Sequence, residues 1–346
     1  MQLYRVFLSL TFIANLDFER RRIRSPRVSK RGLRIPRLLT RGLLIWSHNL
    51  DDRCNHIFFS LFAISLVLFA FACSKEKSAT ETPAIQSIIS TPKTRRAAAT
   101  RFEQNLPEAL PLPTDADVVE KRILKDYGAI FVARSGVFTP PKILFESQAD
   151  CAAWQQNVPT LAANFGGVNI ELQTPAMQAL LAAREEANQK GFSFTARGTW
   201  AARRDYDDTV KIWATRVDPG LNYWTARGKI SGTEAARIRA LAPAAQIAEI
   251  LRLEEKGIFF SKDFSKSVLY SATPPGASQH LSMLAVDLNE NANPAVRAVL
   301  ARHGWFQTVL SDLPHFTFLG VEENELPALG LKKAQADGRT FWIPDQ

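Results

Sequence analysis

The sequence predicts an α+β domain rather than a doubly wound sheet. Short apolar strand patterns and helical patterns follow one another in irregular order from about residue 116, and no internal repeat is present. A chain of 346 residues allows one large or two ordinary domains, and its hydrophobic content of 46% is ample for a packed core. We therefore expect a folded domain over residues 116–346, preceded by segments of different character.

The positive charge of the chain is concentrated at its N-terminal end. The net charge is +9. Residues 1–53 carry 12 basic and 4 acidic side chains, whereas residues 54–346 carry 31 and 30. A groove for phosphate backbones requires a local basic excess in the folded domain. The nearly neutral body therefore argues against nucleic-acid binding.

An uncharged apolar run, IFFSLFAISLVLFAFA, occupies residues 57–72 and follows Arg53. Its 16 residues are few for a membrane span, which needs about 20, but they suit the apolar core of a signal peptide. The small residues before Cys73 resemble the lipobox of bacterial lipoproteins, although its first position is Ala rather than Leu. The resemblance implies a signal peptide over residues 53–72 and lipidation of Cys73. A signal anchor that stays in the membrane is the alternative, and both place the domain outside the cytoplasm.

Two further segments surround this leader. Residues 1–52 are basic and lack an amphipathic period, so we interpret them as an extension from a mis-assigned start, with a genuine basic arm as the alternative. Residues 73–115 are rich in Ser, Thr, Pro and Ala, which predicts a lipidated tether and linker. Among the three cysteines, only Cys151 lies in the folded domain, where we expect a small buried hydrophobe.

Helical periodicity predicts four helical regions in the domain. The apolar face of the first region is formed by Met177, Leu180, Leu181 and Ala182. Ser231 is placed to cap the third, which Pro243 interrupts, and Pro294 begins the fourth. The four regions are residues 175–190, 200–213, 231–253 and 294–303.

Short apolar runs predict the strands. They are residues 129–132, 192–196, 268–271, 284–288 and 316–319. In the fourth run, alternation places Ala285 and Asp287 on one face and Leu284 and Val286 on the other. A carboxylate that enters a buried face needs a partner or a metal ion, so Asp287 is a candidate ligand.

Histidines are scarce in the domain, which makes His280, His303 and His315 worth testing. His280 lies seven residues before Asp287, so a turn between them is needed to bring the two side chains together. His315 follows a proline and begins the last predicted strand. His303 precedes a glycine at a helix end, where the helix dipole favours it, and we interpret it as structural.

Two imidazoles and one carboxylate are a ligand set typical of catalytic zinc. They leave the fourth position of a tetrahedral ion open for water, whose pKa zinc lowers to about 7. Asp312 lies three residues before His315 and is placed to take the proton of that water. The alternative is an ordinary set of residues: a surface His280, a capping Asp287 and a histidine in the core at 315.

Two motifs resemble those of the LAS-type zinc metallopeptidases, which include the VanY-like D-alanyl-D-alanine carboxypeptidases and the endolysin-type L-alanyl-D-glutamate peptidases. PPGASQHLSMLAVDL, residues 274–288, is similar to the signature Ser-x-His-x-x-Gly-x-Ala-x-Asp. DLPHFTFLG, residues 312–320, is similar to the motif with an acid three residues before the second His ligand. The resemblance covers about residues 175–320.

The resemblance implies a fold with a small central antiparallel sheet flanked by helices. It implies that His280, Asp287 and His315 bind Zn²⁺ and that Asp312 is the catalytic base. It also implies cleavage of peptide bonds in the peptidoglycan stem, often next to a D-amino acid, with Ser278 among the substrate-binding residues.

The chain departs from the family pattern between these motifs. Trp200 stands where the family has an arginine that binds the substrate carboxylate, so Arg197 or Arg203 is the candidate substitute. Arg197 is preferred because it ends a predicted strand, and an ordinary surface arginine is the alternative for either. Met283 replaces a family glycine, and residues 214–266 are interpreted as an insertion over the cleft.

Two functions therefore follow from the sequence. The first is a zinc peptidase that trims peptidoglycan stem peptides from a lipid anchor in the membrane of the cell envelope, facing the periplasm or the exterior. The second is a cell-wall-binding or structural lipoprotein that has the same scaffold without catalysis. The changed arginine motif and Met283 favour the second, and the complete ligand set with Asp312 favours the first.

Overall fold

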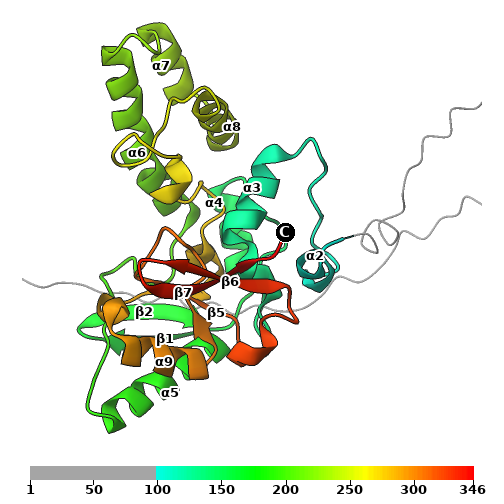
Figure 1. The fold of residues 1–346 in the computed structure, drawn as a ribbon, viewed down its shortest axis with the longest axis vertical. Coiled ribbons are helices and arrows are strands. Elements are labelled where there is room, and N and C mark those ends of the chain that lie inside the picture. Colours follow the sequence, from blue (N-terminus) through cyan, green and yellow to red (C-terminus); the bar gives the residue numbers. More distant parts are fainter. Residues whose placement is uncertain (1–98) are drawn as a thin grey trace, which may run out of the picture. The chain divides into compact units, whose positions relative to one another are not determined.

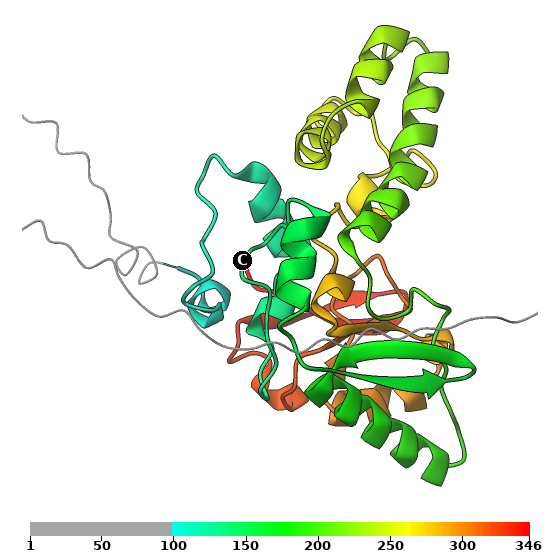
Figure 2. The same cartoon turned by 180° about the vertical axis from the view of Figure 1, so that it is seen from behind.

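A computed structural model of the chain describes residues 99–346, which form helices and small antiparallel sheets (Figures 1 and 2). This mixed content confirms the α+β class. The α-helices are α2 (Arg101–Asn105), α3 (Val118–Tyr127), α4 (Gln148–Gln155), α5 (Thr174–Gln189), α6 (Tyr206–Ala226), α7 (Gly232–Arg239), α8 (Pro243–Glu254) and α9 (Pro294–Arg302). The 3-10 helices are η1 (Gly128–Val132), η2 (Val268–Tyr270), η3 (Gln279–Ser282), η4 (Asn289–Ala292) and η5 (Glu323–Glu325).

The described strands form three separate antiparallel sheets. The sheet that matters for the site has the order β3-β5-β4, so β5 lies between two strands that precede it in the chain. Two hairpins, β1–β2 and β6–β7, make the other sheets. The strands are β1 (Thr160–Phe165), β2 (Val168–Gln173), β3 (Ala285–Asp287), β4 (Trp305–Phe306), β5 (His315–Phe318), β6 (Leu331–Ala336) and β7 (Arg339–Pro344).

Helices α5 and α9 pack side by side near this sheet (Figure 1). Met177 and Leu180 of α5 are fully buried, as predicted, whereas Leu181 is partly buried and Ala182 is exposed. Ala183 occupies the buried face instead. Asn293 caps α9 through its side chain, and Pro294 occupies the first turn, where the missing N–H costs no helical hydrogen bond. Both predicted helices are therefore confirmed within one residue at each end.

Helices α6, α7 and α8 group together at one side of this folded part, away from the sheets (Figures 1 and 2). The Ser231 side chain accepts from the backbone N–H of Glu234, and Pro243 starts α8, which confirms the predicted break. The helix predicted over residues 200–213 begins instead at Tyr206, because Asp205 and Asp208 form a capping box there, and it continues to Ala226. The insertion over residues 214–266 stays a prediction.

Two predicted strands are wrong. Residues 129–132 belong to η1 and residues 268–270 to η2. A short continuous apolar run has no period that separates a strand from a buried helical turn, and here the packing selects the turn. Residues 192–196 contribute only an isolated bridge between Ala196 and Leu288.

The folded region also starts earlier than residue 116. Phe102 and Leu106 lie in the hydrophobic core, although both fall in the segment predicted to be linker. Gly330 has φ +78, and a Cβ there would lie 2.2 Å from the backbone N of Phe102, so a close backbone contact holds α2 against the turn before β6. Cys151 is buried, as expected.

The predictions for the N-terminal segments concern residues outside those that the structure describes. These are the basic extension over residues 1–52, the signal peptide over residues 53–72, lipidation at Cys73 and the first part of the tether. Within residues 99–346, no helix combines the length and apolar character that crossing a membrane requires.

Candidate metal centre

A tight turn delivers His280 to the site. The Ala277 N–H donates to the Pro274 carbonyl over 3.0 Å, and Gly276 takes φ +82. A Cβ at Gly276 would lie 2.0 Å from the carbonyl oxygen of Phe145, so only glycine is accommodated. The chain then forms η3, which ends at Met283 in the left-handed region with φ 57. This turn allows His280 and Asp287 to lie together, although their separation of seven residues would place them on opposite faces of a single straight strand.

Strand pairing delivers the other two candidate ligands. In the β3–β5 register, Asp287 lies opposite His315, and Val286 lies opposite Phe316. Val286 and Phe316 are buried with the core. Because side chains alternate along a strand, this apolar pairing places Asp287 and His315 together on the other face.

The three predicted ligands converge at one point. His280 Nε2 and His315 Nδ1 are 3.1 Å apart. Asp287 Oδ1 lies 3.3 Å from His280 Nε2 and 3.2 Å from His315 Nδ1. Both rings are almost fully buried, with 2% and 3% of their surface exposed. The described residues contain no other group of histidine, cysteine or acidic side chains placed to hold a metal ion.

Each candidate ligand forms a hydrogen bond with a further group through the atom that does not face the other ligands. His280 Nδ1 lies 2.8 Å from the Ala202 carbonyl, and His315 Nε2 lies 2.9 Å from Gln279 Oε1. Arg204 donates to the outer oxygen of Asp287, Oδ2, over 2.9 Å. Partners of this kind orient metal ligands and fix the protonated nitrogen of each ring.

These partners leave the inward nitrogens without protons. A carbonyl oxygen only accepts, so the proton of His280 resides on Nδ1. The Gln279 amide nitrogen donates to the Tyr127 carbonyl over 2.8 Å, which turns Oε1 towards His315 and places that ring's proton on Nε2. Two nitrogen lone pairs therefore face one carboxylate oxygen, an arrangement that a cation stabilises.

The donor set and its spacing suit zinc. An ion bound tetrahedrally at about 2.0–2.1 Å separates its ligand atoms by about 3.3 Å, close to the observed separations. Imidazole nitrogens favour zinc over the hard cations, which prefer oxygen. Three protein donors leave one position open for water, as in catalytic zinc sites.

Charge and burial shape the protonation of the ligands. Burial, with a further contribution from the charge of Arg204, lowers the pKa of His280 to about 4. Burial would raise the pKa of Asp287, but its contacts with His280 and His315 hold that pKa well below the usual range. The ligands are therefore a neutral imidazole and a carboxylate at neutral pH, the forms that bind metal.

Asp312 lies beside this cluster, on the turn that precedes β5. The backbone N–H of His315 donates to the Asp312 carbonyl over 3.2 Å, which fixes the turn. Burial raises the pKa of the Asp312 carboxyl, and the Asp287 carboxylate adds to the rise, against the attraction of His315 and Arg204. A carboxyl whose pKa is raised towards neutrality is better matched to proton transfer.

The predicted substrate-binding residues differ in their exposure and in their contacts. Arg197 is exposed, its backbone N–H donates to the Asp287 carbonyl over 2.9 Å, and its charge lowers the pKa of Asp312. Arg203 donates to Glu171 over 2.8 Å, in a groove of about 400 Å³ that Ala202 and Arg204 also line. Ser278 is buried at the start of η3. Their contacts with substrate stay predictions.

Sequence reasoning missed two residues that contact the candidate ligands, Arg204 and Gln279. Gln279 directly precedes His280, but its partner His315 is 36 positions away, which no local pattern reveals. Arg204 is the neighbour of the predicted Arg203. A pair of adjacent arginines gives no signal of which one turns towards Asp287.

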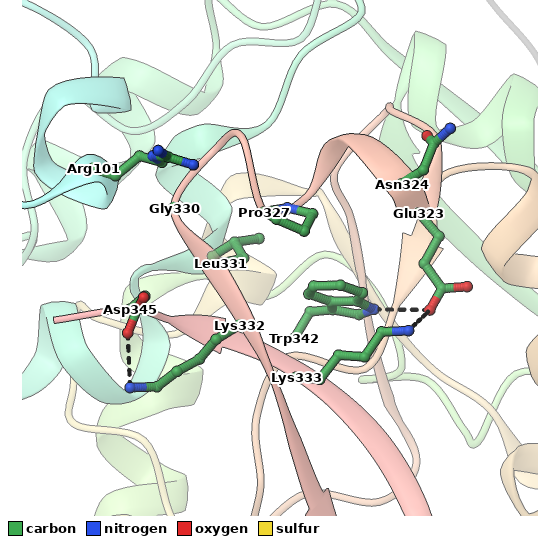
Figure 3. A pocket seen from close by; sticks show the side chains of 10 residues that line it. All are labelled: Arg101, Glu323, Asn324, Pro327, Gly330, Leu331, Lys332, Lys333, Trp342 and Asp345. Carbon is green, nitrogen blue, oxygen red and sulfur yellow. Dashed lines mark hydrogen bonds and ion pairs between the residues drawn. The ribbon is translucent and has the colours of Figure 1, made fainter.

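A larger pocket lies away from this cluster, between α2 and the β6–β7 hairpin (Figure 3). Its volume is about 930 Å³. Four of its five charged side chains form ion pairs, because Lys333 contacts Glu323 over 3.3 Å and Lys332 contacts Asp345 over 2.9 Å, and the fifth is Arg101. None of the predicted site residues lines it.

Comparisons with known proteins give a limited result. No protein-family profile matches the chain, and no curated protein matches its sequence. Among solved structures, the chain is similar to a mutant of the vancomycin resistance D,D-pentapeptidase VanY, from a VanB-type resistance cassette, in complex with Zn(II). The two are 16% identical, the match covers 48% of this chain and 82% of that one, and the TM-score is 0.28.

Proposed function

We propose that the chain is a zinc-dependent peptidase that cleaves peptide bonds in the stem peptides of peptidoglycan. The observation that carries this proposal is the convergence of two unprotonated imidazole nitrogens and one carboxylate oxygen within 3.3 Å of one another. The sequence motifs around these residues supply the substrate class, because they resemble those of the LAS-type peptidases.

Each residue then has a defined task. His280, Asp287 and His315 would hold the zinc ion, which would supply an activated water molecule as the nucleophile. Asp312 would accept the proton that this water loses on attack at the scissile carbonyl carbon. It would deliver that proton to the leaving amine as the carbon–nitrogen bond breaks. Arg197 or Arg203 binds a carboxylate of the peptide, and Ser278 contributes to the same subsite.

Chelation and re-addition of zinc test the activity directly. The purified full chain is expected to contain one zinc ion and to shorten muropeptides, which mass spectrometry detects. A chelator abolishes cleavage and added zinc restores it. His315→Ala is expected to lose zinc and activity, whereas the matched control His303→Ala keeps both, because His303 pairs with Glu186 on the surface over 2.8 Å. Cleavage that survives chelation contradicts the proposal.

A second candidate function is binding to the cell wall without catalysis. The observation in its favour is that Arg203 pairs with Glu171, and Trp200, at the family's arginine position, is 49% exposed. Under this alternative the protein binds zinc and sediments with purified peptidoglycan, but leaves every stem peptide uncut. The digestion experiment separates the two functions.

We further propose that the protein works in the cell envelope, anchored through Cys73. Support comes from the apolar run before Cys73 and the polar segment after it. Metabolic labelling with a fatty acid is expected to mark the wild-type chain and to leave Cys73→Ser unmarked. Labelling of both chains contradicts the anchor.

A further inference from the structure

A polar groove of about 400 Å³ adjoins the candidate metal centre without containing the candidate ligands. It lies between α4, β2 and the loop of residues 199–205. Two residues of its lining reach the centre: the Ala202 carbonyl lies 2.8 Å from His280 Nδ1, and Arg204 donates to Asp287 over 2.9 Å. The volume falls within the roughly 300–1,000 Å³ of small-molecule sites, so the groove can hold a ligand beside the centre.

The charges of the groove are already balanced. Arg203 donates to Glu171 Oε1 over 2.8 Å, and the guanidinium of Arg204 is paired with Asp287. The remaining acids of the lining form the capping box at the start of α6, where the helix dipole favours negative charge. Neither arginine of the lining is left to bind an anion, so the groove suits a neutral polar ligand.

Several accessible side chains of the lining have polar atoms without a partner among residues 99–346. Glu171 uses Oε1 for both of its side-chain contacts, so Oε2 is free, and its side chain is 34% exposed. Asn169 is exposed; its Oδ1 accepts from Asn164 over 2.9 Å, and its Nδ2 is free. Gln156 and Thr199 are exposed and form no side-chain hydrogen bond. The groove therefore offers both donors and acceptors to a ligand.

The edge of β2 that borders the groove is already hydrogen-bonded. The Arg203 N–H donates to the Glu171 carbonyl over 3.3 Å, and the Gln173 N–H donates to the Met283 carbonyl over 2.9 Å. An extended peptide that adds to a sheet needs a free strand edge. Recognition in this groove therefore depends on side chains.

Trp200 supplies an exposed aromatic ring on the loop that forms one wall of the groove. This residue is 49% exposed. Its carbonyl accepts from Arg204 Nε over 2.9 Å, and Gln155 Nε2 of α4 donates to the Arg204 carbonyl over 2.9 Å, so the loop is held against α4. An indole ring offers a flat apolar face. The loop thus presents an apolar ring next to the polar groups of the groove.

We propose that this groove binds a neutral sugar unit of a glycan chain. A pyranose ring has hydroxyl groups at its rim, each of which donates and accepts, and an apolar face of C–H groups. The hydroxyl groups bond to Asn169, Glu171 and Thr199, and the C–H face stacks on Trp200.

The position of the groove also assigns a substrate class, and this step rests on the proposed function. Because the sugar subsite adjoins His280 and Asp287, a stem peptide that is still attached to its glycan binds at both places at once. The glycan-linked peptide is therefore the preferred substrate, and the free peptide is a poorer one.

Sugar binding is tested on zinc-free full-length protein, so the result does not depend on the proposed peptidase activity. Titration calorimetry is run with N-acetylchitotetraose and with N-acetyl-tetra-alanine amide, a neutral peptide. The sugar is expected to give saturable binding and the peptide none. The proposal is overturned if the sugar shows no saturable binding up to about 10 mM, where a site with a millimolar Kd would be filled. It is also overturned if the peptide binds as tightly as the sugar.

Variants locate the binding. Trp200→Ala is expected to weaken sugar binding about tenfold, and Trp200→Phe to restore most of it. Asn169→Asp keeps the acceptor for Asn164 but loses the free donor, so about fivefold weaker binding is expected. The matched control is Phe138→Ala, because Phe138 is 50% exposed and does not line the groove; its affinity is expected to equal that of the wild type. Melting temperatures show that each variant is folded, and wild-type affinity in both Trp200→Ala and Asn169→Asp overturns the proposal.

Cleavage by the zinc-loaded protein tests the substrate class. A disaccharide-linked stem peptide is expected to give a higher kcat/KM than the same peptide without sugar, mainly through a lower KM, and Trp200→Ala is expected to remove this advantage. Equal kcat/KM for the two substrates overturns the role of the groove in substrate choice. If neither substrate is cleaved while N-acetylchitotetraose still binds, the proposed peptidase fails and the sugar site stands.

Discussion

Gln279 is predicted to set the zinc affinity although it is not a ligand. In the wild type, its Oε1 accepts from His315 Nε2 over 2.9 Å, which leaves Nδ1 free for metal. In Gln279→Met, the His315 proton moves to Nδ1, where Asp287 Oδ1 lies 3.2 Å away and accepts it. Zinc then has to displace this hydrogen bond, worth about 0.5–1.5 kcal/mol. We expect the Kd for zinc to rise about tenfold, the lower end of the range for such partners.

The same substitution affects stability by a separate route. It leaves His315 Nε2 and the Tyr127 carbonyl without their partners, whereas Thr317 Oγ1 keeps Thr308 at 2.7 Å. Two buried unpaired groups cost about 2–6 kcal/mol in unfolding free energy. Chemical denaturation measures this loss, and competition with a chromophoric chelator measures the zinc affinity of the folded variant.

A matched control separates the two effects. Gln173 is also fully buried, and its side chain donates to the carbonyls of Phe138 and Ser282 over 2.7 Å each, without contact to an imidazole. Gln173→Met is therefore expected to lose similar stability while its zinc Kd stays within about twofold of the wild type. An unchanged zinc affinity in folded Gln279→Met, or equal losses in both variants, would refute the tautomer argument.

Three other predictions address catalysis, pH and the turn between the ligands. Under the proposed function, Asp312→Asn is expected to lower kcat by about 10²–10⁴, since the proposed general base is lost. Metal analysis should find the zinc content unchanged because no candidate ligand is touched, and loss of zinc would contradict this. Burial raises the pKa of Glu254 above 4.5, so its ionisation destabilises the fold as pH rises through that range. Denaturation at several pH values should show that the unfolding free energy of Glu254→Gln rises relative to that of the wild type as the pH increases. A difference that stays constant with pH would argue against it. Met283→Gly should relieve about 1–2 kcal/mol of strain in the left-handed backbone but remove a fully buried side chain worth about 2–5 kcal/mol. We therefore expect chemical denaturation to show a lower free energy of unfolding, with the zinc affinity retained. A variant more stable than the wild type would contradict this expectation.

The elements that the sequence predicted share a strong local signal. Helix α5 has apolar residues at helical spacing, and α8 and α9 begin at prolines. Strands β3 and β5 follow apolar runs next to turns. The hairpin strands β1 and β6, TLAANF and LKKAQA, are mostly polar or small and half exposed, so their pairing depends on contacts that no local pattern encodes.

The sequence predicted the candidate ligands but not the hydrogen bonds that orient them. The scarcity of histidine and the motif spacing pointed to His280, Asp287 and His315, which the structure brings together. Arg204 and Gln279 were not predicted, because a hydrogen bond between distant segments depends on rotamer and packing. Met283 was expected to alter the turn; the backbone there adopts the left-handed conformation that glycine favours, with φ 57.

The apolar face of the β3–β5 pair determines where the candidate ligands lie on the opposite face. A slip of β5 by one residue would place Phe316 opposite Asp287 and turn His315 into the core. Val286 and Phe316 are 0% and 1% exposed, so the slip would exchange buried apolar surface for a buried imidazole and would cost several kcal/mol. The packing of these apolar residues therefore determines the geometry of the candidate ligands. For the same reason, polar substitutions at Val286 or Phe316 should scatter the ligands as effectively as the loss of a ligand itself.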